Sequence, residues 1–156
     1  MDCQPHHPAN RSQEHLIMTN PPIPRVGCGA AIFRKDQLLL VKRKRNPEAG
    51  HWGLPGGKVD PYEKVADTAV REIEEELGIQ IQAPELLCVV DQIDRTAGQH
   101  WVAPVFLVEA FIGEPAIREP EALAEMGWFD LSSLPSPLTE ATRQALQALQ
   151  GRSGYR

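Results

Sequence analysis

Three features are missing from this sequence, and each absence excludes a class of protein. No apolar run is long enough for a signal peptide or a membrane span. The cysteines Cys3, Cys28 and Cys88 are scattered, odd in number and without metal-ligand spacing, which predicts reduced thiols in a cytoplasmic protein. An excess of basic residues is also missing. The formal net charge of −5 argues against nucleic-acid binding through a general basic surface.

What is present fits one globular domain. Of the 156 residues, 42% are hydrophobic and 24% are charged, which is typical of a water-soluble fold. Residues 1–24 are polar and rich in proline, which predicts a flexible N-terminal arm in which Met18 is an alternative start. Residues 25–150 are predicted to form the single domain, and residues 151–156 a flexible C-terminal tail.

The densest group of charged residues lies in the segment Gly57–Ile79, GKVDPYEKVADTAVREIEEELGI. If Val65–Leu77 is helical, the side chains of Glu72, Glu75 and Glu76 share an arc of about 100°. A neighbouring arc is apolar and suited to burial. It consists of Ala66, Ala69, Val70, Ile73 and Leu77.

Carboxylates at this spacing repel one another by a few tenths of a kcal/mol in an isolated helix. A divalent cation removes the repulsion, and Mg²⁺ typically takes one or two carboxylates together with water and phosphate oxygens. The arc therefore predicts a metal that bridges protein and phosphate. The alternative is a solvated acidic helix face. Glu74 rotates away from the arc and is predicted to face solvent.

The spacing of the fixed residues favours the metal site. The segment resembles the Nudix box, G-x5-E-x7-R-E-U-x-E-E-x-G-U with U aliphatic, and every position is filled: Gly57, Glu63, Arg71, Glu72, Ile73, Glu75, Glu76, Gly78 and Ile79. Such a match arises by chance on the order of 10⁻⁸ per chain of this size. The resemblance implies the Nudix fold, an α/β fold with a mixed β-sheet sandwiched between α-helices (an α/β/α sandwich).

The resemblance also implies residue roles. Glu72, Glu75 and Glu76 would be metal ligands, and Glu75 or Glu76 would take the proton of the attacking water. Arg71 would orient a carboxylate such as Glu72, and Glu63 would support the site. The cofactor would be Mg²⁺, with Mn²⁺ as the alternative.

The sequence allows two starting points for this helix. Asp60 and Pro61, with Glu63 after them, have the N-cap, first-turn proline and capping-box acid of a helix that begins at Pro61. The family pattern begins the helix after Glu63, and we follow it. Where many relatives have Gly and then Ser or Thr around this glutamate, the chain has Tyr62 and Lys64.

Two segments before the helix are candidates for substrate contact. Trp52–Gly57 contains three glycines and a proline, so Gly56 and Gly57 allow the backbone to approach a ligand closely. Arg43 and Arg45 belong to the only dense basic run and are candidates for phosphate contact, with a solvated strand end as an equal alternative.

A further metal ligand is expected downstream, because in MutT-like Nudix enzymes a loop there often supplies another acid before a strand that contains Trp. Glu121 is the choice by its spacing before Trp128, with Glu119 close behind, and an acidic surface loop is the alternative. Aromatic side chains are candidates for stacking on a base, although most buried ones pack the core. They are Trp52, Trp101, Phe106 and Phe129.

Hydrophobic patterning predicts the other elements. Strands are expected at Val26–Phe33, Leu38–Lys42, Leu86–Ile93 and Trp101–Ile112, with the first two forming a hairpin. Thr139 is the candidate N-cap of a second helix over Gln144–Leu149.

The predicted function is metal-dependent hydrolysis of a nucleoside diphosphate-linked substrate by water attack at phosphorus. The downstream segment is most similar to that of the MutT-like branch, which favours a nucleoside tri- or diphosphate as the small-molecule partner. ADP-ribose or a nucleotide sugar is the alternative substrate. A non-catalytic nucleotide sensor and an enzyme acting on RNA 5′ ends are further alternatives. No stable nucleic-acid or membrane partner is expected, and a homodimer is left open.

Overall fold

The computed structural model describes residues 22–152. Most of the predicted N-terminal arm and most of the predicted C-terminal tail lie outside the described residues. No helix of the described part is long and apolar enough to cross a membrane. The elements in chain order are β1 (Arg25–Arg34), β2 (Gln37–Arg43), β3 (Trp52–Gly53), β4 (Gly56–Lys58), α1 (Val65–Leu77), β5 (Gln80–Gln82), β6 (Glu85–Asp94), β7 (Gln99–Val108), β8 (Ala110–Ile112), β9 (Leu123–Asp130) and α2 (Glu140–Gln150).

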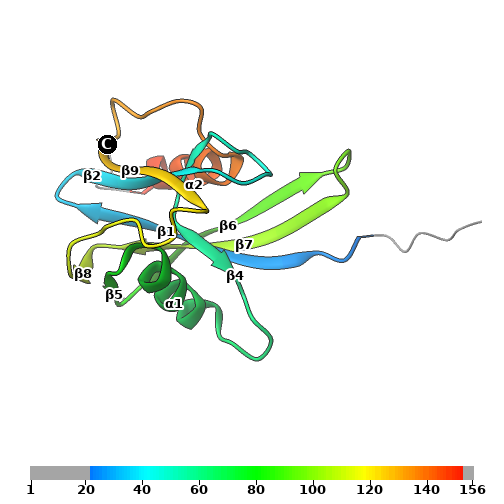
Figure 1. Ribbon diagram of the computed structural model, residues 1–156, viewed down its shortest axis with the longest axis horizontal. Helices are drawn as coiled ribbons and strands as arrows, with labels where there is room; N and C mark the ends of the chain where they lie inside the picture. The colour runs from blue at the N-terminus through cyan, green and yellow to red at the C-terminus, as the bar shows by residue number, and fades with distance from the viewer. Residues whose placement is uncertain (1–21, 153–156) are drawn as a thin grey trace, which may run out of the picture.

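A mixed sheet forms the centre of the molecule (Figure 1). Its strands follow the order β3-β2-β1-β7-β6, with β4 paired to β1 and β9 paired to β2. β1 and β7 run parallel, whereas β6–β7 and β2–β9 are antiparallel pairs. β5 and β8 form a separate antiparallel pair beside α1. Because β4 pairs with the first half of β1, the glycine-rich turn is fixed to the sheet next to α1.

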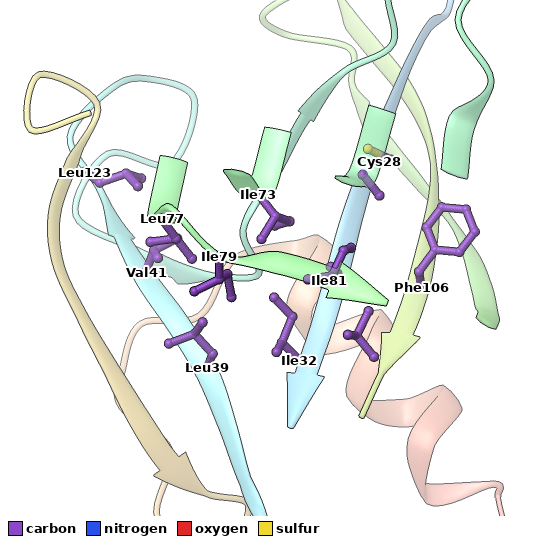
Figure 2. Packing of buried hydrophobic residues seen from close by; sticks show 13 residues of the cluster. Cys28, Ile32, Leu39, Val41, Ile73, Leu77, Ile79, Ile81, Phe106 and Leu123 are labelled. Atoms are coloured by element: carbon purple, nitrogen blue, oxygen red, sulfur yellow. The ribbon is translucent and has the colours of Figure 1, made fainter. Parts of the chain in front are cut away.

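The two helices cover opposite faces of this sheet, which confirms the predicted α/β/α sandwich. Figure 2 shows Ile73 and Leu77 of α1 packed among buried residues of β1, β2, β5 and β7. A second buried cluster lies under α2. Strand β2 contributes to both clusters, with Leu39 and Val41 on the α1 side and Leu38 and Leu40 on the α2 side. This alternation explains why β2 is continuously apolar in sequence.

The boundaries of α1 agree with the family pattern. Tyr62 has a positive φ of 68°, which is incompatible with a helix running from Pro61, and Lys64 occupies the N-cap position. The helix ends at Gly78, whose φ of 70° is left-handed and whose N–H donates to the carbonyl oxygen of Glu74 at 2.9 Å. Glycine adopts this conformation without steric cost.

One predicted strand was wrong. Trp101–Ile112 is not continuous, because β7 stops at Val108 and β8 begins at Ala110 in the other sheet. The chain changes partner here: Val108 pairs with Ile32 of β1, whereas Ala110 pairs with Gln82 of β5. An apolar run that crosses from one sheet to another has the same pattern as one long strand. The second helix spans Glu140–Gln150, so it begins four residues before the predicted Gln144 and directly after the predicted N-cap Thr139, whose side chain accepts a hydrogen bond from the Thr142 N–H.

Candidate active site

Three segments converge on the carboxylate face of α1. The first is the turn before α1, where the Gly56 N–H donates to Glu76 Oε2 at 3.1 Å. The second is α1 itself. The third is the segment 113–122 between β8 and β9, where the Arg118 N–H donates to the Glu76 carbonyl oxygen at 2.8 Å. Glu76 is therefore contacted from both neighbouring segments.

Arg71 joins the carboxylates of this face. Its Nε and Nη2 donate to the two oxygens of Glu63 at 2.7 and 2.9 Å, a bidentate arrangement. Its Nη1 donates to Glu72 Oε1 at 3.0 Å and to Glu75 Oε2 at 3.2 Å. Its Nη2 also lies 3.3 Å from Asp60 Oδ2, so the structure brings Arg71 to four acids.

Glu63 is held ionised by these contacts. The hydrogen bonds from Arg71, together with that from the Thr68 hydroxyl, which donates to Oε2 at 2.7 Å, lower the pKa of Glu63 to about 2. The Asp60 N–H also donates to this oxygen at 3.2 Å. Because both oxygens are occupied, Glu63 is suited to fixing Arg71 and not to carrying a proton.

Glu76 has the opposite environment. Burial, and to a smaller extent the charges of Glu72 and Glu119, raise the pKa of Glu76 to about 8. The Gly56 N–H and the charge of Arg43 lower it in part. One buried carboxyl facing two other carboxylates is a position where a bound cation relieves both burial and repulsion.

Glu72 lies against the glycine turn. A Cβ on Gly57 would lie 2.2 Å from Glu72 Cδ, so the absence of a side chain lets the carboxylate approach the backbone. Gly56 is equally restricted, because a Cβ there would lie 2.1 Å from the carbonyl oxygen of Cys28 on β1. Burial is also the main cause that raises the pKa of Glu72, and Glu75 and Glu119 contribute to the rise.

The downstream acid that the structure brings to this site is Glu119. Its charge raises the pKa of both Glu72 and Glu76. Glu121 is exposed, and its charge is not among the main influences on either carboxyl. Spacing before Trp128 could not separate the two residues, because the path of the irregular segment 113–122 decides which side chain faces α1.

The residues of the basic run around Arg43 and Arg45 differ in their contacts. Arg43 faces the site, since its charge acts on Glu76, and its Nε donates to the Pro47 carbonyl oxygen at 3.1 Å. Arg45 is exposed and forms no ion pair within residues 22–152. Lys44 Nζ donates to the Pro120 carbonyl oxygen at 2.8 Å. Pro47, which accepts the hydrogen bond from Arg43, also lines a pocket.

The pocket has a volume of about 680 Å³ and lies between the loop after β2, the tip of the β6–β7 hairpin and the start of α2. Trp101 lines it, together with Glu48 and Gln92. Glu48 Oε1 accepts from the Glu140 N–H at 2.8 Å and its Oε2 accepts from Gln92 Nε2 at 3.2 Å, which fixes the pocket wall.

Of the four aromatic candidates, Trp101 is the one that lines this pocket. Phe106 belongs to the buried cluster under α1. Trp52 and Phe129 pack edge to face in the other cluster, with ring centroids 5.1 Å apart. These three side chains pack the core.

The residues present fit a hard divalent cation. In the described part of the chain, no three acidic, histidine or cysteine side chains converge tightly enough to form a ready-made metal cage. Mg²⁺ does not require one, because it takes one or two carboxylates and completes its shell with water and phosphate oxygens. The all-oxygen donor set of Glu72, Glu75, Glu76 and Glu119 suits this ion, and burial of Glu76 beside like charges favours its uptake.

The arrangement of box helix, glycine turn and mixed sheet agrees with comparison to known proteins. The profile of the NUDIX domain matches residues 23–149. The chain belongs to the Nudix family. A crystal structure of a MutT NUDIX hydrolase from Burkholderia pseudomallei is 61% identical and superposes with a TM-score of 0.81, over 81% of this chain and 98% of that one.

Two curated Nudix relatives have named activities. An ADP-ribose pyrophosphatase of Methanocaldococcus jannaschii is 37% identical over 112 residues, which cover 72% of this chain and 65% of the relative. The human 8-oxo-dGDP phosphatase is 33% identical over 113 residues, which cover 69% of this chain and 33% of the relative. The chain thus spans less than two thirds of the length of both.

Proposed function

We propose that this Nudix protein hydrolyses a phosphoric anhydride bond in a nucleoside diphosphate-linked substrate, with Mg²⁺ as cofactor and Mn²⁺ as the alternative. The observation that carries the proposal is the group of crowded carboxylates beside the glycine turn, in which the partly buried Glu76 accepts from the Gly56 N–H and feels the charges of Glu72 and Glu119. Ionised carboxylates in such a position are costly without a cation. A phosphate chain brings the remaining oxygen ligands that Mg²⁺ needs.

Glu72, Glu75 and Glu76 would hold the ion, with Glu119 as a further acid in place of Glu121. When bound, the cation supplies neutralisation of phosphate charge and activation of the attacking water. Arg71 keeps Glu72 and Glu75 in place through its Nη1, and Glu63 keeps Arg71 in place through both oxygens. The metal role of Glu121 stays a prediction.

The proton of the attacking water passes to a carboxylate. Glu76 suits this role because burial raises its pKa and so makes its carboxylate a stronger base, and because Oε2 is held by the Gly56 N–H, which leaves Oε1 to accept the proton. Glu75 is more exposed and paired with Arg71. The water oxygen forms its bond to phosphorus as the bridging P–O bond breaks in line, and the leaving phosphate keeps the bonding electron pair.

The substrate proposed first is a nucleoside tri- or diphosphate, which includes oxidised nucleotides. The similarity to the Burkholderia protein and to the human 8-oxo-dGDP phosphatase supports this class. The nucleoside would enter the pocket beside Trp101. Arg43, which donates to Pro47 of the pocket and whose charge acts on Glu76, would contact the phosphates. For a triphosphate, the products are nucleoside monophosphate and pyrophosphate. ADP-ribose is the second candidate, supported by the similarity to the M. jannaschii enzyme.

The test is release of phosphate and pyrophosphate from a substrate panel, with Mg²⁺ and with a chelator. The panel holds nucleoside triphosphates and diphosphates, oxidised nucleotides, ADP-ribose, nucleotide sugars and dinucleoside polyphosphates. Mg²⁺-dependent pyrophosphate from one group of triphosphates, or phosphate from diphosphates, is the expected result.

Cleavage of ADP-ribose or sugar conjugates alone would promote the second candidate. Folded protein that binds a nucleotide without metal, and turns over no member of the panel, would instead identify a nucleotide sensor. The complete set of acids in the Nudix box favours the enzyme over the sensor.

A further inference from the structure

The segment 113–122 carries Glu119 to the carboxylate face, although it contains no helix or strand of its own. One side of it is attached to the end of α1. The Ala116 N–H donates to the Leu77 carbonyl oxygen at 3.0 Å, and the Arg118 N–H donates to the Glu76 carbonyl oxygen at 2.8 Å. These two carbonyls belong to the last turn of the helix, which has no intrahelical donors for them.

The side chain of Arg118 strengthens this attachment. A Cβ added to Gly78 would lie 2.0 Å from Arg118 Nε, so the guanidinium rests directly on the glycine that ends α1. A cation at the C-terminus of a helix is attracted by the helix dipole. Gly78 thus has two functions: it adopts the left-handed turn, and it leaves room for Arg118.

The other side of the segment is attached to the strand end that carries the basic run. The Lys44 N–H donates to the Ala122 carbonyl oxygen at 2.9 Å, and Lys44 Nζ donates to the Pro120 carbonyl oxygen at 2.8 Å. The Ala122 and Leu123 N–H groups both donate to the Glu119 carbonyl oxygen at 3.0 Å. Glu119 is therefore flanked by residues fixed from two directions.

We propose that Lys44 and Arg118 are positioning residues that clamp the segment 113–122 from its two sides and so hold Glu119 against the carboxylates of α1. This inference rests on the proposed function, because Glu119 has a role only if the carboxylates bind metal. It assigns Lys44, a member of the basic run, to the segment and not to phosphate. Neither residue touches the substrate, and both act through Glu119.

The experiment compares Lys44→Met and Arg118→Gln, which replace each cation with an uncharged, unbranched side chain, with Lys35→Met as control. Lys35 lies in the turn between β1 and β2, away from the end of β1 that pairs with β4. Two quantities are measured: Mn²⁺ affinity of the folded, substrate-free protein by calorimetry, and kcat and KM separately. Circular dichroism checks folding.

Both variants are expected to bind Mn²⁺ about tenfold more weakly and to lose kcat to a similar extent, with nucleotide KM nearly unchanged. In a Glu119→Gln background, neither substitution should weaken Mn²⁺ binding further, because its effect passes through Glu119. A raised nucleotide KM with unchanged Mn²⁺ affinity in Lys44→Met would overturn the clamp and identify a phosphate contact.

The Glu119→Gln variant distinguishes failure of the clamp from failure of the metal site. If it binds Mn²⁺ weakly while Lys44→Met and Arg118→Gln bind normally, the clamp is wrong and the proposed metal site stands. If Glu119→Gln itself binds Mn²⁺ like wild type, Glu119 is outside the metal site and the clamp is overturned with it. Wild-type protein that binds no Mn²⁺ and turns over no nucleotide would overturn the proposed function.

Discussion

At Glu76, protonation and folding are coupled. The carboxyl has a usual pKa of 4.5 when unfolded and a pKa of about 8 in the folded, metal-free protein. Between these values the folded state binds more protons, so the free energy of unfolding falls as the pH rises from about 4.5 to about 8.

Glu63 has the opposite effect on the pH dependence of stability. Its pKa of about 2 means that its contribution is present above pH 4.5 and is lost as the pH falls toward 2.

The metal-free protein should therefore have its highest melting temperature near about pH 5. The melting temperature should fall as the pH rises toward about 8. Thermal unfolding followed by circular dichroism in EDTA measures this. Glu76→Gln should flatten the decline, whereas Glu74→Gln, an exposed neighbour on the same helix, should keep it. A wild-type melting temperature that is level over this range would show that Glu76 is ionised in the fold.

Glu76→Gln also tests the proposed reaction. The substitution keeps the shape of the side chain and removes its charge and its basicity, so turnover should fall at least about a hundredfold. The steady-state rate at saturating Mg²⁺ is the measurement, with Glu74→Gln expected to change little. Near-normal activity in folded Glu76→Gln would remove Glu76 from the site.

The sequence predicted the site residues on α1 more completely than the site residue on the segment 113–122. Glu72, Glu75 and Glu76 share a helical arc because the spacing within one helix determines it. The choice between Glu119 and Glu121 depended on an irregular segment whose path is set by contacts to Lys44 and to the end of α1. No pattern within that segment encodes those contacts.

At the scale of elements, the distance between β4 and α1 controls the site. Gly57→Ala would place a methyl group within 2.2 Å of Glu72 Cδ and push the carboxylate aside. A displacement of about 1 Å can cost about a hundredfold in rate, and we expect a loss of this size in kcat. The control is Gly151→Ala, whose Cβ would meet only the Ala148 carbonyl oxygen at 3.5 Å, an ordinary contact. Equal kcat in the two variants would show that Glu72 tolerates displacement.

Helices and strands whose regular hydrophobic pattern extends over many residues were predicted well, and very short strands were not. The strands β1, β2 and β6 and the helix α1 lie within a few residues of their predicted ranges. β3, β4 and β5 have two or three residues each and no recognisable alternation. They exist because β1, β2 and β8 offer them partners. Such strands are tertiary features, which local propensity does not encode.

Metal binding should increase the free energy of unfolding of the whole molecule. A ligand that binds only the folded state adds about 2.7 kcal/mol to the free energy of unfolding at a concentration of 100 Kd. Urea unfolding at pH 7.5 with increasing Mg²⁺ should show this gain, and NaCl of equal ionic strength should not. The Glu72→Gln/Glu76→Gln double variant should lose most of it. Equal stabilisation of the double variant would place the bound ion elsewhere.

The strand pairing also determines when the protein can fold. Arg25 of β1 pairs with Trp101 of β7, and Gln37 of β2 pairs with Asp130 of β9. Contacts between such distant positions require costly loop closure and slow the search for the native state. On the ribosome, β1 and β2 leave the exit tunnel long before these partners do. Until β7 and β9 have emerged, the apolar side chains of β1 and β2 are without these partners, and exposed apolar strands of this kind favour aggregation.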